Sequence, residues 1–182
     1  MRIIGIDPGL QSTGWGVIAS DGAQFKGVSH GIIRTTTRMS DPERLILIFE
    51  GLQNVIANYH PETAIVEEIF VKDNPRSALR LGLARGVAIL ACGQARLALS
   101  EISARKVKQA VTGTGAADKK QVANMVSRLL GIPPPPSDAA DALALAIACY
   151  QGAAAPKTEA AQMPDGLSAA IEAALQKDRQ RT

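Results

Sequence analysis

The sequence predicts an α/β domain in which helices pack over a mixed β-sheet. The first third of the chain reads as short strands rich in Ile and Val, the apolar spacing then becomes helical, and later strands and helices follow one another without strict alternation. With 182 residues, 46% of them hydrophobic, the chain can bury one core. We therefore expect one domain over residues 1–151. The Ala- and Gly-rich residues 152–182 are expected to form a flexible tail with a marginal helix over 167–176.

Three strands are expected at the start of the chain. Residues 2–7 are an apolar run rich in Ile, and residues 13–19 and 27–35 have strand composition. Asp7-Pro8-Gly9 has the chemistry of a turn, because Pro presets φ and Gly tolerates positive φ. Consecutive strands joined by short turns indicate an antiparallel meander.

The remaining elements follow from a change of period. Residues 41–58 carry apolar side chains at helical spacing, with Asp41 as the expected N-cap before Pro42. Residues 63–67 and 97–102 are expected strands, and residues 77–96, 103–111, 118–130 and 137–150 are expected helices. Asp118 and Gly131 have the cap and stop chemistry for the helix over 118–130. The four prolines at 133–136 force an extended spacer before the last helix.

Charge is distributed unevenly along the chain. The formal net charge is +3, yet residues 72–128 hold eleven Lys and Arg against three acids. A basic stretch beside an acidic cluster suits a polyanionic substrate, although a solvated basic face explains the charge equally well. We expect no membrane span, no secretory signal, and reduced, buried thiols at Cys92 and Cys149, which together place the chain in the cytoplasm.

Four acids stand at the ends of expected elements. Asp7 closes the first strand, Glu67 ends the strand over 63–67, and Asp138 and Asp141 share one face at the start of the last helix. If the strands that end at Asp7 and Glu67 are neighbours, these carboxylates converge at one sheet edge and repel one another. A divalent cation would relieve that repulsion, and oxygen ligands without His or Cys favour Mg²⁺ or Mn²⁺.

Each acid also has an ordinary explanation. Asp7 could serve the turn alone, and Asp138 could be an N-cap with Asp141 near the positive helix end. Glu67 and Glu68 are adjacent, so in a strand only one of them can join the cluster. The prediction rests on the four acids occurring together.

Several motifs, in order, resemble the RuvC family of Holliday junction resolvases. They are Ile4-Gly5-Ile6-Asp7-Pro8-Gly9, Thr13-Gly14-Trp15-Gly16-Val17-Ile18, Ile65-Val66-Glu67-Glu68-Ile69-Phe70, Ser77-Ala78-Leu79-Arg80-Leu81-Gly82, Ala84-Arg85-Gly86-Val87-Ala88, Ala104-Arg105-Lys106-Val107-Lys108-Gln109 and Asp138-Ala139-Ala140-Asp141-Ala142-Leu143-Ala144. The resemblance covers about residues 1–150 and leaves out the tail. It departs from the family at Glu68, where glutamine is common, and at Lys120, where a small polar residue is common.

The resemblance implies an RNase H-like fold with a five-stranded mixed sheet, its first three strands antiparallel, flanked by helices. It implies a homodimer that resolves four-way DNA junctions by paired symmetric nicks in recombination and repair, with a RuvA/RuvB-type branch-migration complex as partner. Asp7, Glu67, Asp138 and Asp141 would be the catalytic acids and hold two Mg²⁺ ions, which Mn²⁺ can replace, with Asp7 as the bridging ligand.

The resemblance also suggests how the DNA is held. It implies that Lys108 and Lys119 lie near the scissile phosphate and that Phe70 stacks on an unpaired base, although a core position is the ordinary role of a Phe. Further candidates for backbone contacts, for which a solvated helix face is the alternative, are Arg76, Arg80, Arg105, Lys106 and Lys120. Gly82 and Gly86 permit close approach of the 77–96 helix to a second helix or to its own sheet.

Three other functions share part of this pattern. An actin-like ATPase or sugar kinase also opens with Gly-x-Asp-x-Gly, but it needs a second phosphate loop and about twice the length. An RNA-processing nuclease of the same fold would not be expected to share the Phe70 site or the motif from Asp138 to Asp141. A junction-binding protein without activity would be expected to have lost at least one of the four acids.

Overall fold

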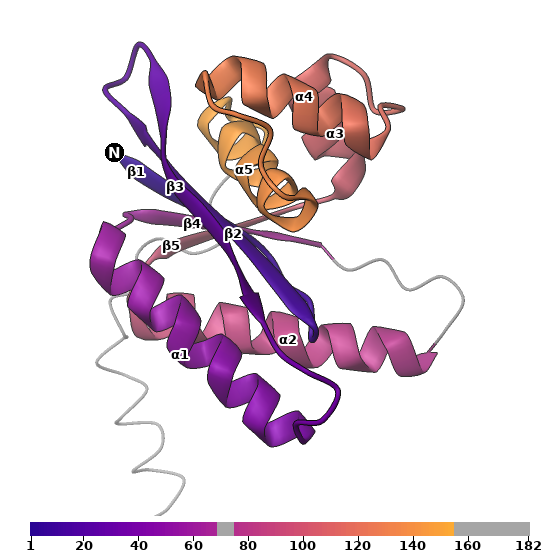
Figure 1. Cartoon of the computed structure of the whole chain (residues 1–182). Helices are drawn as coiled ribbons and strands as arrows, with labels where there is room; N and C mark the ends of the chain where they lie inside the picture. Colours follow the sequence, from indigo (N-terminus) through magenta and orange to yellow (C-terminus); the bar gives the residue numbers. More distant parts are fainter. Residues whose placement is uncertain (69–74, 155–182) are drawn as a thin grey trace, which may run out of the picture.

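The computed structural model describes residues 1–68 and 75–154, with the backbone alone at positions 75 and 76. One five-stranded sheet has the order β3-β2-β1-β4-β5. Helices cover both of its faces, with α1 and α2 on one side and α3, α4 and α5 on the other (Figure 1). The expected α/β class, a mixed sheet flanked by helices, is confirmed.

The sheet begins with the expected antiparallel meander. β1 (Arg2–Asp7) pairs with β2 (Ser12–Ser20), which pairs with β3 (Phe25–Arg34), and both pairings are antiparallel. β4 (Thr63–Glu67) joins the other side of β1 in parallel, and β5 (Ala98–Ile102) extends the sheet in parallel with β4. Each strand lies within two residues of its predicted position.

The helices lie close to their predicted ranges. They are α1 (Asp41–Tyr59), α2 (Pro75–Gln94), α3 (Ala104–Thr112), α4 (Lys119–Leu130) and α5 (Ser137–Tyr150). The expected N-cap at Asp41 is wrong, because Ser40 caps α1. The backbone N and the Oγ of Ser40 each donate a hydrogen bond of 2.7 Å to Glu43 Oε2. The expected end of α2 at position 96 is also too late, because Arg96 has a φ of 56° and the amide of Leu97 donates to Cys92 O at 3.0 Å.

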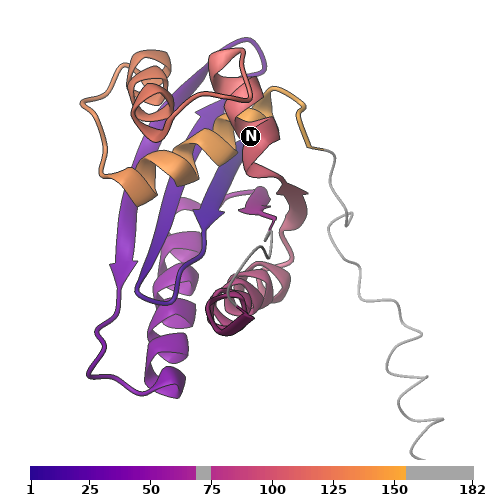
Figure 2. The same cartoon turned by 90° about the vertical axis from the view of Figure 1, so that its right-hand side faces the viewer.

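Two apolar clusters, one on each face of the sheet, form the core. The cluster beneath α5 joins Ile3, Ile18, Ile65 and Ile102 to Val107, Val122 and Leu143. The cluster beneath α1 and α2 joins Ile4, Ile6, Val17 and Val66 to Ile48, Leu52 and Ala88. Alternate residues of β1 therefore enter opposite clusters, as a strand covered on both faces requires. Figure 2 shows the two helical layers from the side.

Three smaller expectations have mixed outcomes. Cys92 is buried as expected, whereas Cys149 is only half-buried, and both are free thiols. None of the helices that the structure describes is both long and apolar enough to cross a membrane. The expected tail helix over 167–176 lies outside the described residues.

Candidate active site at the sheet edge

Asp7 and Glu67 meet because their strands are parallel neighbours. Ile6 is paired with Val66, and each acid is the next residue and the last of its strand. Parallel strands end at the same edge of a sheet, so both carboxyls emerge there. The strands that end at Asp7 and Glu67 are therefore neighbours, as convergence of the acids requires.

Glycines in β1 and β2 let the start of α5 lie directly on the sheet. A Cβ on Gly5 would lie 2.0 Å from Ala142 O, one on Gly14 would lie 2.0 Å from Asp138 O, and one on Gly16 would lie 2.6 Å from Leu143 Cγ. These contacts leave no room for any other side chain. The first two turns of α5 are therefore held against β1 and β2, beside the edge where Asp7 and Glu67 end.

Three of the four acids line one cavity of about 280 Å³. Asp7, Glu67 and Asp141 are its acidic lining residues, and Lys108 and Lys119 line the same cavity. Asp138 is one turn earlier on α5, and its Oδ2 accepts a hydrogen bond from Ser12 Oγ. The alternative in which Asp138 is merely the N-cap is wrong, because Pro136 holds the cap position of α5.

The crowded carboxyls perturb one another. Burial raises the pKa of Asp7 to about 7, and the charges of Glu67, Asp141 and Asp138 add to this effect while Lys119 opposes it. Burial also raises the pKa of Glu67, with a further contribution from Asp141. A hydrogen bond with Asp7 and the charges of Lys119 and Lys108 act in the opposite direction on Glu67. The predicted repulsion is therefore present, and at neutral pH Asp7 is partly protonated in the metal-free protein.

Lys119 is held beside the acids by the start of α4. Asp118 caps this helix: its Oδ1 accepts from Gln121 N at 2.8 Å, while Gln121 Oε1 accepts from Asp118 N at 2.9 Å. The next residue, Lys119, then reaches Asp141, with Nζ 3.1 Å from Oδ2. This hydrogen bond raises the pKa of Lys119. The expected cap at Asp118 is confirmed, while the place of Lys119 near the scissile phosphate stays a prediction.

The other predicted basic residues whose side chains are described lie on α2, α3 and α4. Arg80 is exposed on α2, and Arg105 on α3 lies against Gly115, where an added Cβ would lie 3.0 Å from its Cγ. Lys106 lines a separate groove with Gln109 and Gln151, away from the acid cavity. Lys120 is exposed on α4. Phe70 and the side chain of Arg76 lie outside the described residues, so their predicted roles stay predictions.

The turn that follows Asp7 is anchored by residues that sequence reasoning missed. Thr13 Oγ1 donates to Gly9 O at 2.8 Å, and the buried Arg44 donates to Leu10 O at 3.1 Å and to Thr35 Oγ1 at 2.9 Å. In the sequence Arg44 is one charged residue of an amphipathic helix, so no local signal identifies it. These bonds link the turn to β3 and α1 and hold the backbone beside Asp7.

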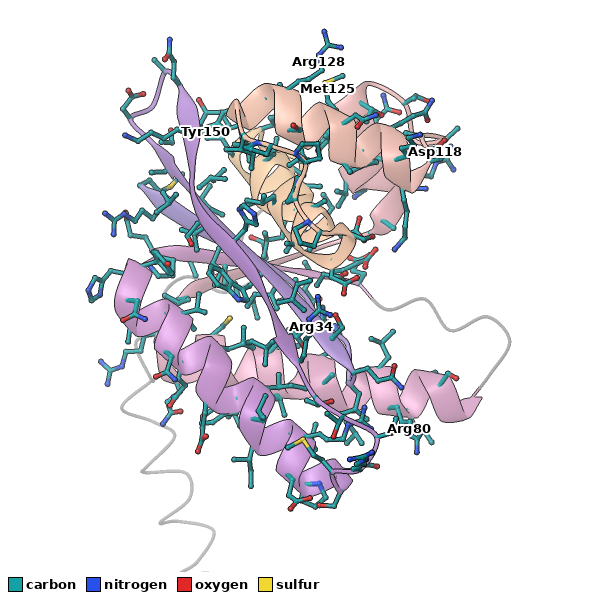
Figure 3. The ribbon with its side chains drawn as sticks, viewed as in Figure 1. Arg34, Arg80, Asp118, Met125, Arg128 and Tyr150 are labelled. Carbon is teal, nitrogen blue, oxygen red and sulfur yellow. The ribbon has the colours of Figure 1, made fainter. Side chains whose placement is uncertain are left out.

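Two further side chains near the acids carried no signal in the sequence. Ser12 reaches Asp138, and Arg34 is paired with Ser12 at the end of β3. Paired residues of antiparallel strands project to the same face, so Arg34 lies on the face that α5 covers. Figure 3 shows Arg34 at the end of β3 and Arg80 on α2. Both arginines are exposed.

Comparison with known proteins identifies the family. The family model described as crossover junction endodeoxyribonuclease RuvC matches residues 3–149. The chain belongs to the RuvC family. A curated RuvC from Acidovorax sp. (strain JS42) is 50% identical over 162 residues, covering 85% of this chain and 87% of the relative. RuvC from Dechloromonas aromatica is 51% identical over 152 residues, covering 83% and 85%.

Solved structures agree with this membership. Thermus thermophilus RuvC in complex with a Holliday junction substrate superposes with a TM-score of 0.79 at 34% identity, over 86% of this chain and 99% of that one. The yeast mitochondrial Holliday junction resolvase Ydc2 has a TM-score of 0.61 at 12% identity, over 83% and 78%, which shows a shared fold alone. The RNase H-like architecture implied by the motifs is confirmed.

Membership in the RuvC family decides between the functions weighed on the sequence. This RuvC chain is a crossover junction endodeoxyribonuclease, which excludes the kinase, the RNA-processing nuclease and the junction-binding protein without activity. Its family consists of nucleases that depend on a divalent metal.

Proposed function

We propose that this RuvC chain resolves four-way DNA junctions by metal-dependent hydrolysis at the edge formed by Asp7, Glu67, Asp138 and Asp141. The observation that carries the proposal is that three separate segments bring these acids together, where burial and then the three neighbouring carboxylates raise the pKa of Asp7 to about 7. Repulsion between carboxylates destabilises the folded protein unless a positive charge lies among them. We therefore infer that these acids bind a cation.

The donor set fits Mg²⁺, with Mn²⁺ as a substitute. All four groups are carboxylates, the hard oxygen ligands that these ions prefer. Within residues 1–68 and 75–154, no three His, Cys, Asp or Glu side chains already surround a single point. Asp141 is paired with Lys119 and would be released to bind an ion, whereas Asp138 would keep one oxygen on the Ser12 hydroxyl and offer the other.

The four acids would divide two ions between them. Asp7, at the centre of the mutual repulsion, is assigned as the bridging ligand, and Glu67, Asp138 and Asp141 would complete the two shells. A bound pair of divalent ions supplies an activated water and stabilises the leaving 3′ oxygen. Lys108 and Lys119 face the same cavity, where their charges offset that of the phosphate in the transition state.

The DNA-binding surface would surround the acids. Lys108 and Lys119 stand on one side, and Arg80 is exposed on α2 on the other. Arg105 extends the surface on α3, and Arg76 at the start of α2 is assigned to the DNA backbone. Phe70 is assigned to stacking on an unpaired base at the junction centre.

We assign dimerisation to the outer face of α2. Leu79, Leu83 and Leu90 are 71%, 46% and 60% exposed, and their spacing puts them on one face of the helix. A Cβ on Gly82 or Gly86 would meet nothing within 4 Å, so packing within one chain does not account for these glycines. A second copy would cover this apolar stripe and place two active sites for paired, symmetric nicks. A RuvA/RuvB-type motor and a cytoplasmic location complete the proposal.

The test is cleavage of a synthetic four-way junction, with a linear duplex of matched sequence as control. We expect paired nicks at the junction with Mg²⁺ or Mn²⁺ and none with EDTA. Asp7→Asn should lower cleavage at least about a thousandfold while junction binding persists, because the bridging ligand is lost and the DNA contacts are not. Normal cutting by this variant at saturating Mg²⁺ would refute the assignment.

The neighbouring glutamates provide a matched control. Glu67→Gln should abolish cleavage, whereas Glu68→Gln should leave it within about threefold, because Glu68 is exposed beyond the end of β4. Equal losses in the two variants would mean that the glutamate ligand is wrongly assigned.

Phe70→Ala should bind the junction yet distort it poorly, and unchanged cleavage would contradict the stacking role.

A further inference from the structure

The edge of the sheet where Asp7, Glu67, Asp138 and Asp141 lie is called the acid edge. A hydrogen bond joins Ser12 to Asp138 there. Ser12 is the first residue of β2, and its Oγ donates to Asp138 Oδ2 on α5. We propose that Ser12 is a positioning residue that orients the Asp138 carboxylate for metal binding. The proposal rests on the metal site assigned to the four acids and extends it to a residue beyond them.

Both partners of this hydrogen bond stand on fixed backbone. Ser12 lies opposite Arg34 in the β2–β3 pairing, and two residues later Gly14 lies opposite Asp7 in the β1–β2 pairing. Side chains alternate along a strand, so Ser12 shares the face of β2 on which Gly14 touches Asp138 O. Neither residue can move without shifting the sheet or the start of α5, so the hydroxyl fixes the side-chain rotation of Asp138.

The two acids of α5 are held in different ways. Asp141 is paired with the cation of Lys119, at 3.1 Å, whereas Asp138 is bound by a neutral hydroxyl. Lys119 Nζ is on a long, exposed side chain and can leave when a cation arrives. The hydroxyl of Ser12 can stay, because a carboxylate bound through one oxygen keeps the other free for a metal. Ser12 therefore acts on Asp138 both before and after metal binding.

The expected size of the effect follows from comparable sites. Hydrogen bonds that orient metal-binding side chains typically contribute 10- to 100-fold to metal affinity. Ser12 acts on one ligand of four, so about tenfold is expected. Its loss should raise the metal concentration needed for cleavage, with little effect on the rate at saturation, because the chemistry itself does not involve the hydroxyl.

The decisive variants are Ser12→Thr and Ser12→Val, which have the same shape and differ in the hydroxyl. Mn²⁺ binding to the full chain without DNA is measured by calorimetry and by electron paramagnetic resonance. We expect Ser12→Val to bind Mn²⁺ about tenfold more weakly and Ser12→Thr to bind within about twofold of wild type. Half-maximal cleavage should shift to about tenfold higher Mn²⁺ in Ser12→Val, with junction binding in EDTA unchanged.

Ser20→Val, at the opposite end of β2, is the matched control and should bind Mn²⁺ as wild type does. The inference is overturned if Ser12→Val keeps wild-type affinity, if Ser12→Thr is as weak as Ser12→Val, or if Ser20→Val is equally impaired. Failure of the metal site itself has a different signature: wild type binds no Mn²⁺, or Asp7→Asn binds it unchanged. In that case the site and the role of Ser12 fall together.

Discussion

Helices α5 and α2 have similar small, apolar compositions and opposite surroundings. Every residue of α5 from Ala142 to Ala148 is buried, and the sheet meets this helix with three glycines. α2 buries Ala84, Ala88 and Ala91 but leaves an outer stripe of leucine and glycine open. The glycines beside α5 lie in β1 and β2 and let this helix approach the sheet closely. The glycines of α2 lie in the helix itself and face away from the rest of the chain. The comparison separates a helix that builds the active site from one that is open to a second chain.

The largest effect is expected where the sheet meets α5. Gly14→Ala would put a Cβ 2.0 Å from Asp138 O, so the start of α5 must move. We expect cleavage to fall at least about 100-fold, since a shift of about 1 Å at a reacting centre has that cost. Stability should fall by about 1–3 kcal/mol from overpacking. Single-turnover cleavage and urea unfolding measure the two effects.

Gly27→Ala is the matched control for this variant, because a Cβ there has ordinary contacts at 3.7 Å. It should cleave within about threefold of wild type. Cleavage by Gly14→Ala at a rate like that of the control would show that α5 is not held in place by the glycine contact.

A second effect is expected on the open face of α2. Leu79→Asp combined with Leu83→Asp should convert a dimer into a monomer, because charges would have to be buried between copies. Light scattering after gel filtration measures the mass. Ile46→Asp, at an exposed position of α1, should leave the dimer intact. A monomeric wild type at micromolar concentration, or a dimeric double variant, would contradict the assignment of this face.

The acid edge should also make stability depend on pH. The pKa of Asp7 is about 7 in the folded, metal-free protein against 3.8 for the free group, so the folded state holds the proton more tightly. Stability should therefore fall as pH rises from about 4 to about 7, by at most about 4 kcal/mol at about 1.4 kcal/mol per pKa unit. Asp7→Asn should flatten this slope, and the α2 variants should not.

Thermal unfolding in EDTA between pH 4 and pH 8 tests this prediction. Mg²⁺ should restore stability chiefly above pH 7, where Asp7 is ionised and can bind a cation. An identical pH slope in wild type and Asp7→Asn would show that the Asp7 proton does not couple to folding.

The smallest effect is expected at Gly86. A Cβ there meets nothing within 4 Å, so Gly86→Ala in the Leu79→Asp, Leu83→Asp background should raise stability by about 1 kcal/mol through helix propensity. Urea unfolding measures this gain. In the dimer the same Cβ should weaken association, since it would enter the space left for the second helix. A loss of stability in the monomeric background would mean that the glycine packs within its own chain.

Much of the architecture follows from local sequence. Three elements, including β1 and α5, have the bounds that period and turn chemistry predict, because alternation, helical spacing and breakers are local properties. The errors lie at ends that depend on geometry: Ser40 rather than Asp41 caps α1, and Arg96 stops the turn after α2 in a left-handed conformation. Non-glycine residues with positive φ carry no strong local signal.

Some features of the acid edge follow from the sequence, and others depend on how the chain folds. The sequence by itself determined which carboxylates stand at element ends, that a cation suits them, and that Lys119 follows a capped helix start. Only the tertiary structure decided that β1 and β4 are neighbours, that glycines at 5, 14 and 16 admit α5, and that Ser12 reaches Asp138. The reason is physical: spacing along a chain sets the direction of a side chain, whereas its partner depends on which segments pack together.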